Sequence, residues 1–207
     1  MVKQWACRSA CRSVVYLVDD DESVLKMLRH LIHSAHHIEV RAYTSADDFI
    51  AAYRPGPCEC LVSDVRMPGI GGLELQQRLK ELGVTLPIVF LSGCTTVGTV
   101  VEAMKQGAVD YLEKPFAAAV LLDKVHLALE RSRHLHAEAL ARDEREAQLA
   151  QLTARERQIA QLVADGRSSR EIASLLHLSV RTVENHRARI MEKLDVHSSV
   201  TLVKLLG

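Results

Sequence analysis

Charged and hydroxyl side chains directly follow four short apolar stretches of this sequence. Apolar runs of this length, bounded by turn residues, predict buried strands. The carboxyl ends of parallel strands meet at one edge of a sheet, so we expect these side chains to lie close together. The groups are Asp19 and Asp20 after Val14–Val18, Asp64 at the end of Cys60–Asp64, Ser92 after Pro87–Leu91, and Lys114 after Asp110–Glu113.

These group types fit the chemistry of phosphoryl transfer. Clustered carboxylates repel one another, and one takes up a proton unless a cation lies among them. Mg²⁺ suits such a place, because it prefers one or two carboxylates together with phosphate oxygens and water. A carboxylate can also act as a nucleophile and form an acyl phosphate. Lys114 and Ser92 would then contact the phosphoryl oxygens, so the sequence predicts an aspartyl-phosphate site with Mg²⁺.

Helical segments alternate with the predicted strands. This alternation predicts an α/β domain with a parallel sheet and right-handed crossovers. The second strand, near Glu39–Tyr43, has the weakest pattern and is expected at an edge. A flavodoxin-like strand order 2-1-3-4-5 would place strands one and three side by side, and with them Asp19, Asp20 and Asp64. The helices are expected at 22–34, 46–53, 71–82, 97–106 and from 117 onward.

The motifs in this half resemble a known family. LVDDDES, LVSDVRMPGIGG, IVFLSG and AMKQGAVDYLEKPF are similar, in order and spacing, to the receiver domain of two-component response regulators. The resemblance implies that Asp64 is the phosphoacceptor and that Lys114 binds the phosphate. It implies a Mg²⁺ site made by Asp19, Asp20, Asp64 and the backbone carbonyl of Arg66. It also implies that Ser92 and Tyr111 switch on phosphorylation.

The remainder of the chain predicts helices only. No Gly or Pro occurs from Ala117 to Gln151, which indicates a fifth helix that continues into a helical linker. Capping boxes at Thr153–Glu156 and Ser168–Glu171, with Ser179 and Ser198 as further N-caps, predict four short helices in a helix-turn-helix layout. The expected parts are an extension at 1–13, a receiver domain at 14–117, a linker at 118–150 that includes the last receiver helix, and an all-α domain at 151–207.

The third of these helices, near 179–194, carries a candidate DNA-binding face. Val183, Ile190 and Leu194 form its core stripe at helical spacing. Small and amide side chains lie opposite and cations lie on the flanks, which suits a major groove with bases at the centre and phosphates at the edges. A merely solvated face fits the helix alone equally well. The candidate contacts are Glu184, Asn185 and Ala188 to bases, Thr182, Arg187, Arg189 and Lys193 to phosphates, and Arg181 and His186 beside them.

The segment from Leu152 to Leu206, above all SVRTVENHRARIMEKL, resembles the LuxR-type helix-turn-helix domain. His177 stands where that family commonly has Gly. A receiver followed by this domain is typical of the NarL/FixJ class of response regulators, and GAVDYLEKPF is closest to FixJ. The resemblance implies a transcription factor that a sensor histidine kinase phosphorylates. It also implies a homodimer on phosphorylation that binds double-stranded promoter DNA, with RNA polymerase as a further partner.

Charge and composition agree with this division. Residues 14–116 carry 9 Lys and Arg against 14 Asp and Glu, a net charge of −5, whereas residues 150–207 carry 9 against 6, a net charge of +3. A basic rear half suits an anionic partner.

No apolar stretch approaches the roughly 18 residues of a membrane span, so a cytoplasmic protein without a membrane partner is expected. The five cysteines lack the spacing of a zinc motif and are expected to be reduced thiols.

Two other functions compete with this one. An aspartyl-phosphate phosphatase needs an acid two residues after its nucleophile, and Arg66 occupies that position. We therefore expect that the protein is not an enzyme. Its receiver would take part only in phosphoryl transfer and in slow self-dephosphorylation. The second alternative is an orphan regulator, switched by a ligand, a thiol or a protein contact. Phosphorylation by acetyl phosphate with Mg²⁺ distinguishes that regulator from a phosphorylated one.

Overall fold

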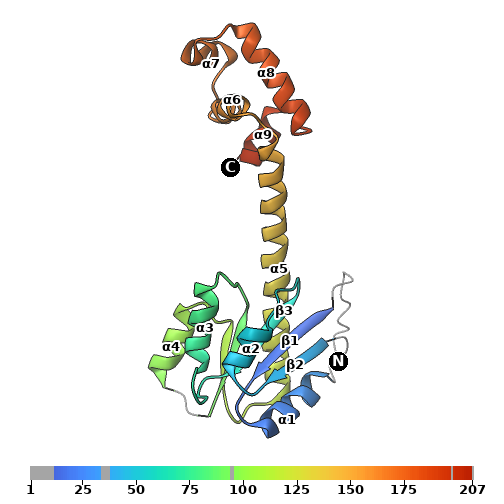
Figure 1. The fold of residues 1–207 in the computed structure, drawn as a ribbon, viewed down its shortest axis with the longest axis vertical. Coiled ribbons are helices and arrows are strands. Elements are labelled where there is room, and N and C mark those ends of the chain that lie inside the picture. The colour runs from blue at the N-terminus through green and yellow to red at the C-terminus, as the bar shows by residue number, and fades with distance from the viewer. Residues whose placement is uncertain (1–11, 34–37, 94–95, 197, 207) are drawn as a thin grey trace. The chain divides into compact units, whose positions relative to one another are not determined.

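The computed structural model describes residues 12–33, 38–93, 96–196 and 198–206. Its N-terminal part contains a five-stranded parallel sheet with the order β2-β1-β3-β4-β5 (Figure 1). The predicted order is confirmed, and the weakly patterned second strand is an edge strand. The strands are β1 Ser13–Val18, β2 Ile38–Tyr43, β3 Glu59–Asp64, β4 Ile88–Ser92 and β5 Asp110–Glu113.

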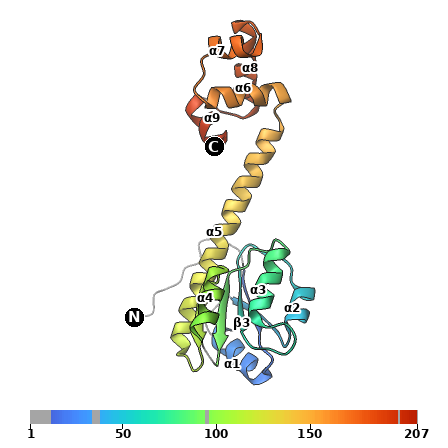
Figure 2. The same cartoon turned by 90° about the vertical axis from the view of Figure 1, so that its left-hand side faces the viewer.

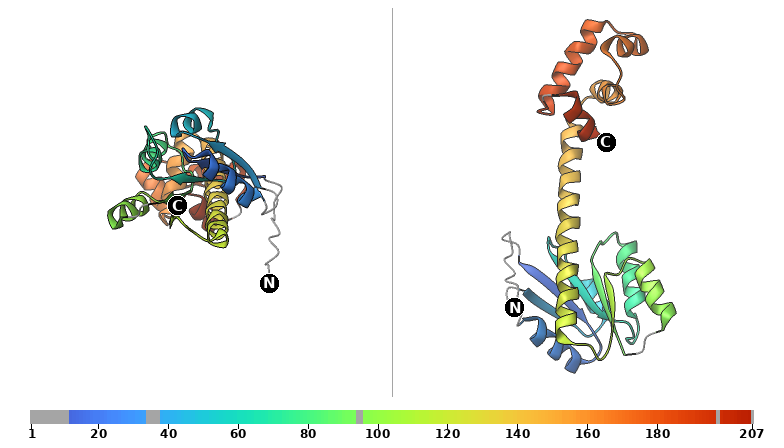
Figure 3. Two further views of the ribbon diagram at one scale, coloured as in Figure 1. Left: turned by 90° about the horizontal axis from the view of Figure 1, so that it is seen from below. Right: turned by 180° about the vertical axis from the view of Figure 1, so that it is seen from behind.

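Helices cover both faces of this sheet. α1 (Glu22–His33) and the first turns of α5 (Ala118–Ala150) pack on one face, around a core that includes Leu28 and Leu121. α2 (Ala46–Ala52), α3 (Gly72–Glu81) and α4 (Val97–Lys105) pack on the other face, around Phe49 and Phe90. α2 lies in front of the strands in Figure 1, and α5 crosses them in the view from behind in Figure 3. Both faces are buried, which explains the near-continuous apolar runs of the central strands.

A glycine lets α3 begin close to the end of β3. The backbone N–H of Gly72 donates to the Val65 carbonyl oxygen at 3.0 Å. A Cβ atom at Gly72 would clash with the carbonyl oxygen of Asp64 and touch the Phe90 ring. Gly69 supplies the turn before it, with a φ of 73° that side chains disfavour. The GIGG sequence thus fixes the backbone just after Asp64.

The C-terminal helices are α6 (Ala154–Ala164), α7 (Ser169–Leu176), α8 (Val180–Lys193) and α9 (Ser199–Leu206) (Figures 1 and 2). They surround a small core that includes Ile159, Ile172, Val183 and Ile190. Both predicted capping boxes are present. Ser179 and Ser198 also accept hydrogen bonds from backbone N–H groups three residues later, as expected of N-caps.

The turn between α7 and α8 explains the departure from the family pattern. His177 ends α7 with φ 52° and ψ 46°, the left-handed conformation for which glycine is usually chosen. The next N–H, that of Leu178, donates to the Ala173 carbonyl oxygen at 2.9 Å. The helix therefore closes in the usual way, with a histidine in place of the glycine.

The chain divides into two compact units, Met1–Ala137 and Glu138–Gly207, with the division inside α5. The buried residues of α5 all belong to the first unit; they are Leu121, Val125, Ala128, Leu129 and Ser132. No helix in the described part of the chain is both long and apolar enough to cross a membrane.

Candidate functional site

Two acidic side chains meet where β1 and β3 end. The strands pair in parallel with Val18 opposite Ser63, so the residues that follow, Asp19 and Asp64, emerge side by side. Both carboxylates are buried, at 3% and 8% exposure. Strand order and register together therefore bring these two predicted site residues to one place.

Lys114 joins these two carboxylates. Its Nζ donates to Asp19 Oδ2 at 2.7 Å and to Asp64 Oδ1 at 2.6 Å. Burial acts to lower the pKa of Lys114, but the hydrogen bonds to both carboxylates outweigh it and raise the pKa above its ordinary value. A charged ammonium therefore stands between the two acids and offsets their repulsion.

The backbone also orients Asp64. Its Oδ2 accepts the N–H of Arg66 at 2.7 Å, while Lys114 holds Oδ1. Ser92 ends the neighbouring strand β4, is 1% exposed, and its carbonyl oxygen accepts the Lys114 N–H at 2.7 Å. The hydroxyl-bearing residue and the lysine predicted to contact a phosphoryl group are thus adjacent. The assignment of the Arg66 carbonyl as a metal ligand stays a prediction.

The three acids after β1 have different surroundings. Asp19 is buried and accepts the Asp21 N–H at 3.0 Å, whereas Asp20 is exposed. Asp21 accepts the Ser23 N–H at 2.7 Å at the start of α1, and this hydrogen bond lowers the pKa of Asp21. Asp21 therefore caps α1, which leaves Asp19 and Asp20 as the acids available to the site.

The donor set fits Mg²⁺. No three His, Cys, Asp or Glu side chains of the described residues form a ready-made metal cage. Mg²⁺ needs only one or two carboxylates, because it keeps several waters and takes phosphate oxygens. Asp19 and Asp64 converge on one ammonium, and the exposed Asp20 follows Asp19 in the chain. These oxygen donors could hold the ion beside Asp64.

Tyr111, the predicted switch aromatic, lies on β5 against the ring of Phe90, with ring centroids 6.4 Å apart. Its hydroxyl is buried and makes no hydrogen bond to the described residues. A buried hydroxyl without a partner costs free energy. The switch role of Tyr111 stays a prediction.

The predicted DNA-binding face lies on α8. Val183, Ile190 and Leu194 are buried in the core of the C-terminal unit, as the stripe predicts. Most of the opposite face is exposed to solvent. Thr182 is half-buried, and its hydroxyl is hydrogen-bonded to the hydroxyl of the N-cap Ser179, with the two oxygens 2.8 Å apart. His186 is also half-buried, with Nδ1 enclosed. The exposed members of the predicted set are Arg181, Glu184, Asn185, Ala188, Arg189 and Lys193.

Two predicted phosphate contacts are engaged inside the domain. The half-buried Arg187 donates through Nη1 to Ser169 Oγ of α7 at 3.4 Å. Lys193 Nζ donates to Glu156 Oε2 of α6 at 2.6 Å and to the Gln151 carbonyl oxygen at 3.4 Å. A carboxylate thus already pairs with Lys193, and the predicted phosphate contact of Lys193 stays a prediction. Arg187 stays a prediction.

Sequence patterns missed the roles of two buried acids. Glu156 was visible only as a capping residue, because its partner Lys193 is 37 positions away. Glu59, 5% exposed at the start of β3, accepts the hydroxyl of Tyr53. Its apolar flanks give no signal for that contact. Of the cysteines, Cys58 and Cys60 are buried free thiols, whereas Cys7, Cys11 and Cys94 lie outside the described residues.

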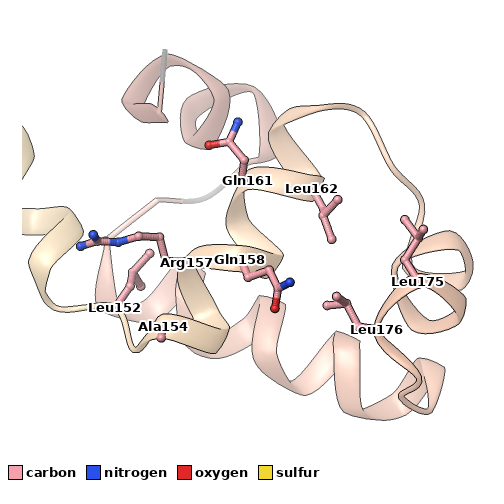
Figure 4. A pocket seen from close by; sticks show the side chains of 8 residues that line it. All are labelled: Leu152, Ala154, Arg157, Gln158, Gln161, Leu162, Leu175 and Leu176. Atoms are coloured by element: carbon pink, nitrogen blue, oxygen red, sulfur yellow. The ribbon is translucent and has the colours of Figure 1, made fainter.

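A groove of about 880 Å³ runs between α6 and α7 (Figure 4). Its lining consists of leucines and alanine with Arg157, Gln158 and Gln161, and Leu162, Leu175 and Leu176 face it from two helices. It shares no residue with the predicted DNA contacts and contains no acid or histidine. The groove offers no chemistry of its own.

Family comparisons agree with both halves. Residues 15–126 match the response regulator receiver domain, and residues 150–206 match the bacterial regulatory proteins of the luxR family. The first match alone covers more than half of the chain. The chain is a two-component response regulator of the NarL/FixJ class. It is therefore a regulator of transcription with a LuxR-type DNA-binding domain.

Individual relatives span nearly the whole response regulator. This chain is 40% identical over 198 residues to the transcriptional regulatory protein TdiR of Thauera aromatica, and the match covers 96% of this chain and 87% of TdiR. It is 39% identical to FixJ of Azorhizobium caulinodans over 191 residues, covering 92% and 90%. Among solved structures, the response regulator StyR has a TM-score of 0.83 at 38% identity and covers 94% of this chain and 98% of StyR. Full-length FixJ of B. japonicum has a TM-score of 0.57 at 36% identity and covers 95% and 96%.

Proposed function

We propose that a sensor histidine kinase phosphorylates this response regulator on Asp64. The ammonium of Lys114, within 2.7 Å of both Asp19 and Asp64, is the observation that carries the proposal. An Oδ–P bond forms at Asp64 as the P–N bond of the phosphohistidine breaks, and its electron pair returns to the imidazole. Lys114 is already placed to donate a hydrogen bond to a phosphoryl oxygen on Asp64.

Mg²⁺ would serve as the cofactor of this step, and Asp19, Asp20, Asp64 and the Arg66 carbonyl would hold it. It would supply positive charge to the phosphoryl oxygens as the bond forms. The chain's own residues do the remaining work. The Arg66 N–H and Lys114 fix the orientation of the Asp64 carboxylate before the donor arrives.

Phosphorylation then moves Ser92 and Tyr111 and favours a homodimer that binds double-stranded promoter DNA through α8. A two-state element biased by contacts to the phosphate would link the two events. The stripe Val97, Val101 and Met104 on α4 is exposed at 81%, 43% and 44%, which suits a surface that becomes covered. RNA polymerase is the further partner on DNA.

The chemistry of the receiver ends at its own phosphorylation and slow dephosphorylation. Arg66 stands two residues after Asp64, and a phosphatase of the aspartyl-phosphate type needs an acid there. We therefore propose a cytoplasmic regulator without substrate turnover.

Acetyl phosphate with Mg²⁺ tests the proposal on the full-length chain. Intact mass should rise by one phosphoryl group in the wild type and in Asp47→Asn, which alters an exposed acid of α2. Asp64→Asn should remain folded and gain no phosphate, because an amide is a poor nucleophile. Phosphorylation of Asp64→Asn at the wild-type level would refute the assignment, and no phosphorylation of the wild type would favour the orphan regulator.

A further inference from the structure

A buried carboxylate lies behind the DNA-binding helix. Glu156 is 4% exposed, in the first turn of α6. Its Oε2 accepts the N–H and the hydroxyl of Thr153 at 2.9 and 3.0 Å, and the Nζ of Lys193 at 2.6 Å. These contacts, that of Lys193 foremost, lower the pKa of Glu156 to about 2. The group is therefore a carboxylate at neutral pH and holds Lys193 by a charge-assisted hydrogen bond.

This bridge joins three parts of the C-terminal unit. Lys193 is the last residue of α8, and Glu156 lies at the start of α6. The Nζ of Lys193 also donates to the carbonyl oxygen of Gln151, in the connection between α5 and α6. A cation at the C-terminus of one helix and an anion at the N-terminus of the other each complement the helix dipole. The bridge thus fixes the last turn of α8 against the first turn of α6.

The ammonium of Lys193 already donates to Glu156 and to Gln151, which leaves one of its three N–H groups for any further partner. A contact to DNA that drew the ammonium away would leave the buried Glu156 with its hydrogen bonds from Thr153 but without a counter-ion, which is costly. Arg189, one turn earlier on α8, is exposed and has no hydrogen-bond or ion-pair partner among the described residues. The flank of α8 therefore already carries a cation that can reach a phosphate without breaking a bond.

We propose that Lys193 is a positioning residue for DNA recognition. Through Glu156 it sets the orientation of α8 and so aligns Glu184 and Asn185 with base edges, while its own ammonium contacts no phosphate. The inference rests on the proposed role of α8 in the major groove. It replaces a direct electrostatic role of Lys193 by an indirect, geometric one.

Binding experiments on the full-length phosphorylated chain separate these roles. The probes are a duplex selected from random DNA by the wild type and a scrambled duplex of equal length. The variants are Lys193→Met, which keeps the apolar stem, Glu156→Gln, which keeps the capping acceptor, their double variant, and Arg189→Met as matched control. Affinity is measured over a range of salt concentrations, after circular dichroism has shown that each variant is folded.

A positioning residue predicts a specific pattern. Lys193→Met should bind the selected duplex about tenfold more weakly, in the range of one lost base contact, with affinity for the scrambled duplex nearly unchanged. Its slope of log K against log salt should equal that of the wild type, whereas Arg189→Met should lower the slope by about 0.9. Glu156→Gln should weaken binding in the same way, and the double variant should be no worse than either single one, because both break one bridge.

The opposite results would overturn the inference. A phosphate contact predicts that Lys193→Met lowers the slope as Arg189→Met does and weakens both duplexes alike. Tighter binding by Glu156→Gln would mean that its charge only repels DNA. Asn185→Ala distinguishes the two proposals: unchanged base preference in that variant would refute the assigned orientation of α8, whatever Lys193 does.

A measurement on the wild-type chain covers the case in which Lys193→Met does not fold. Lysine acetylation by an active ester, followed by peptide mass spectrometry, reports how accessible each amine is. A lysine that is paired with Glu156 should react slowly and to the same extent with and without the selected duplex. Strong protection of Lys193 by DNA would show a phosphate contact and refute the proposal.

Discussion

At the scale of single residues, the exposed face of α8 divides into side chains that can read bases and side chains that can only bind phosphate. Asn185 is exposed opposite the core stripe Val183–Ile190–Leu194. An amide can bind adenine through N6 and N7 at once, which few other side chains can do. The identity of this residue should therefore matter at one base pair only.

Asn185→Ala should cost about 1–3 kcal/mol of binding free energy at a single base position and relax the preference there. Affinities for a set of duplexes that differ at one position each would measure this. The matched control is Arg189→Met, which should weaken all of these duplexes alike. A uniform loss across the set in Asn185→Ala would contradict the assigned face.

Glu59 is a residue whose protonation should change the stability of the receiver. Burial raises its pKa above the ordinary value, against the opposing effect of the Tyr53 hydroxyl. The folded state then binds the proton more tightly than the unfolded state. Stability therefore falls as the pH rises from about 4.5, the unfolded value, through the raised folded value.

Glu59→Gln should remove this pH dependence and make the receiver more stable at pH 7 than the wild type, with little difference at pH 4. The amide keeps an acceptor for Tyr53 and carries no buried charge. Urea unfolding of both proteins between pH 4 and pH 8 would measure it. Glu74→Gln, at an exposed acid of α3 paired with Arg78, is the control and should show no such gain. Parallel curves for wild type and Glu59→Gln would contradict the prediction.

At the scale of elements, the turn between α7 and α8 positions the DNA-binding helix at a cost in conformational free energy. His177 adopts the left-handed conformation, which is unfavourable for a residue with a Cβ atom. Its side chain is exposed and has no core contact to lose. His177→Gly should therefore raise the free energy of unfolding of the C-terminal unit by about 1 kcal/mol.

Denaturant unfolding of the full-length chain, monitored by hydrogen exchange of the amides of α7 and α8, would test this increase in the free energy of unfolding. Ser174→Gly is the matched control, because glycine inside α7 should destabilise by roughly 0.5 kcal/mol relative to serine. A loss of stability in His177→Gly would mean that the histidine contributes a contact that compensates its backbone strain.

The elements themselves were predictable because each has a local signal. Apolar runs that end on Asp19, Asp64 and Ser92 defined the strands, and side-chain caps such as Thr153 and Ser168 defined the helix starts. The alternation of strand and helix predicted a parallel sheet, and the flavodoxin-like strand order assumed for that sheet brought Asp19 and Asp64 together. Contacts between distant residues had no such signal. The bridge from Lys193 to Glu156 and the hydroxyl of Tyr53 on Glu59 depend on packing, which periodicity does not encode.

At the scale of the whole molecule, the two halves differ in charge. The receiver residues 14–116 carry a net charge of −5 and the residues 150–207 a net charge of +3. An acidic receiver has no net electrostatic attraction to the DNA phosphates, whereas a basic domain is attracted to DNA of any sequence. Specific recognition then needs a second contribution, and two copies of α8 on two half-sites would supply it.

The α4 surface is where we expect phosphorylation to bring two copies together. Val97, Val101 and Met104 follow one another at helical spacing and are all exposed, although valine and methionine are usually buried. A receiver dimer would remove this stripe from water. A charge in its centre should prevent that, because the carboxylate would have to be desolvated without a partner.

Val101→Asp should therefore accept phosphate on Asp64 as the wild type does, yet stay monomeric at concentrations where the phosphorylated wild type dimerises. Sedimentation velocity with and without acetyl phosphate and Mg²⁺ measures both states. Leu82→Asp is the matched control: Leu82 is 65% exposed at the end of α3 and is not part of this stripe, so its replacement should leave dimerisation unchanged. If Val101→Asp dimerises to the wild-type extent, the dimer forms through another surface. If the wild type shows equal dimer fractions in both states, phosphorylation does not control assembly, and DNA binding must be switched within one chain.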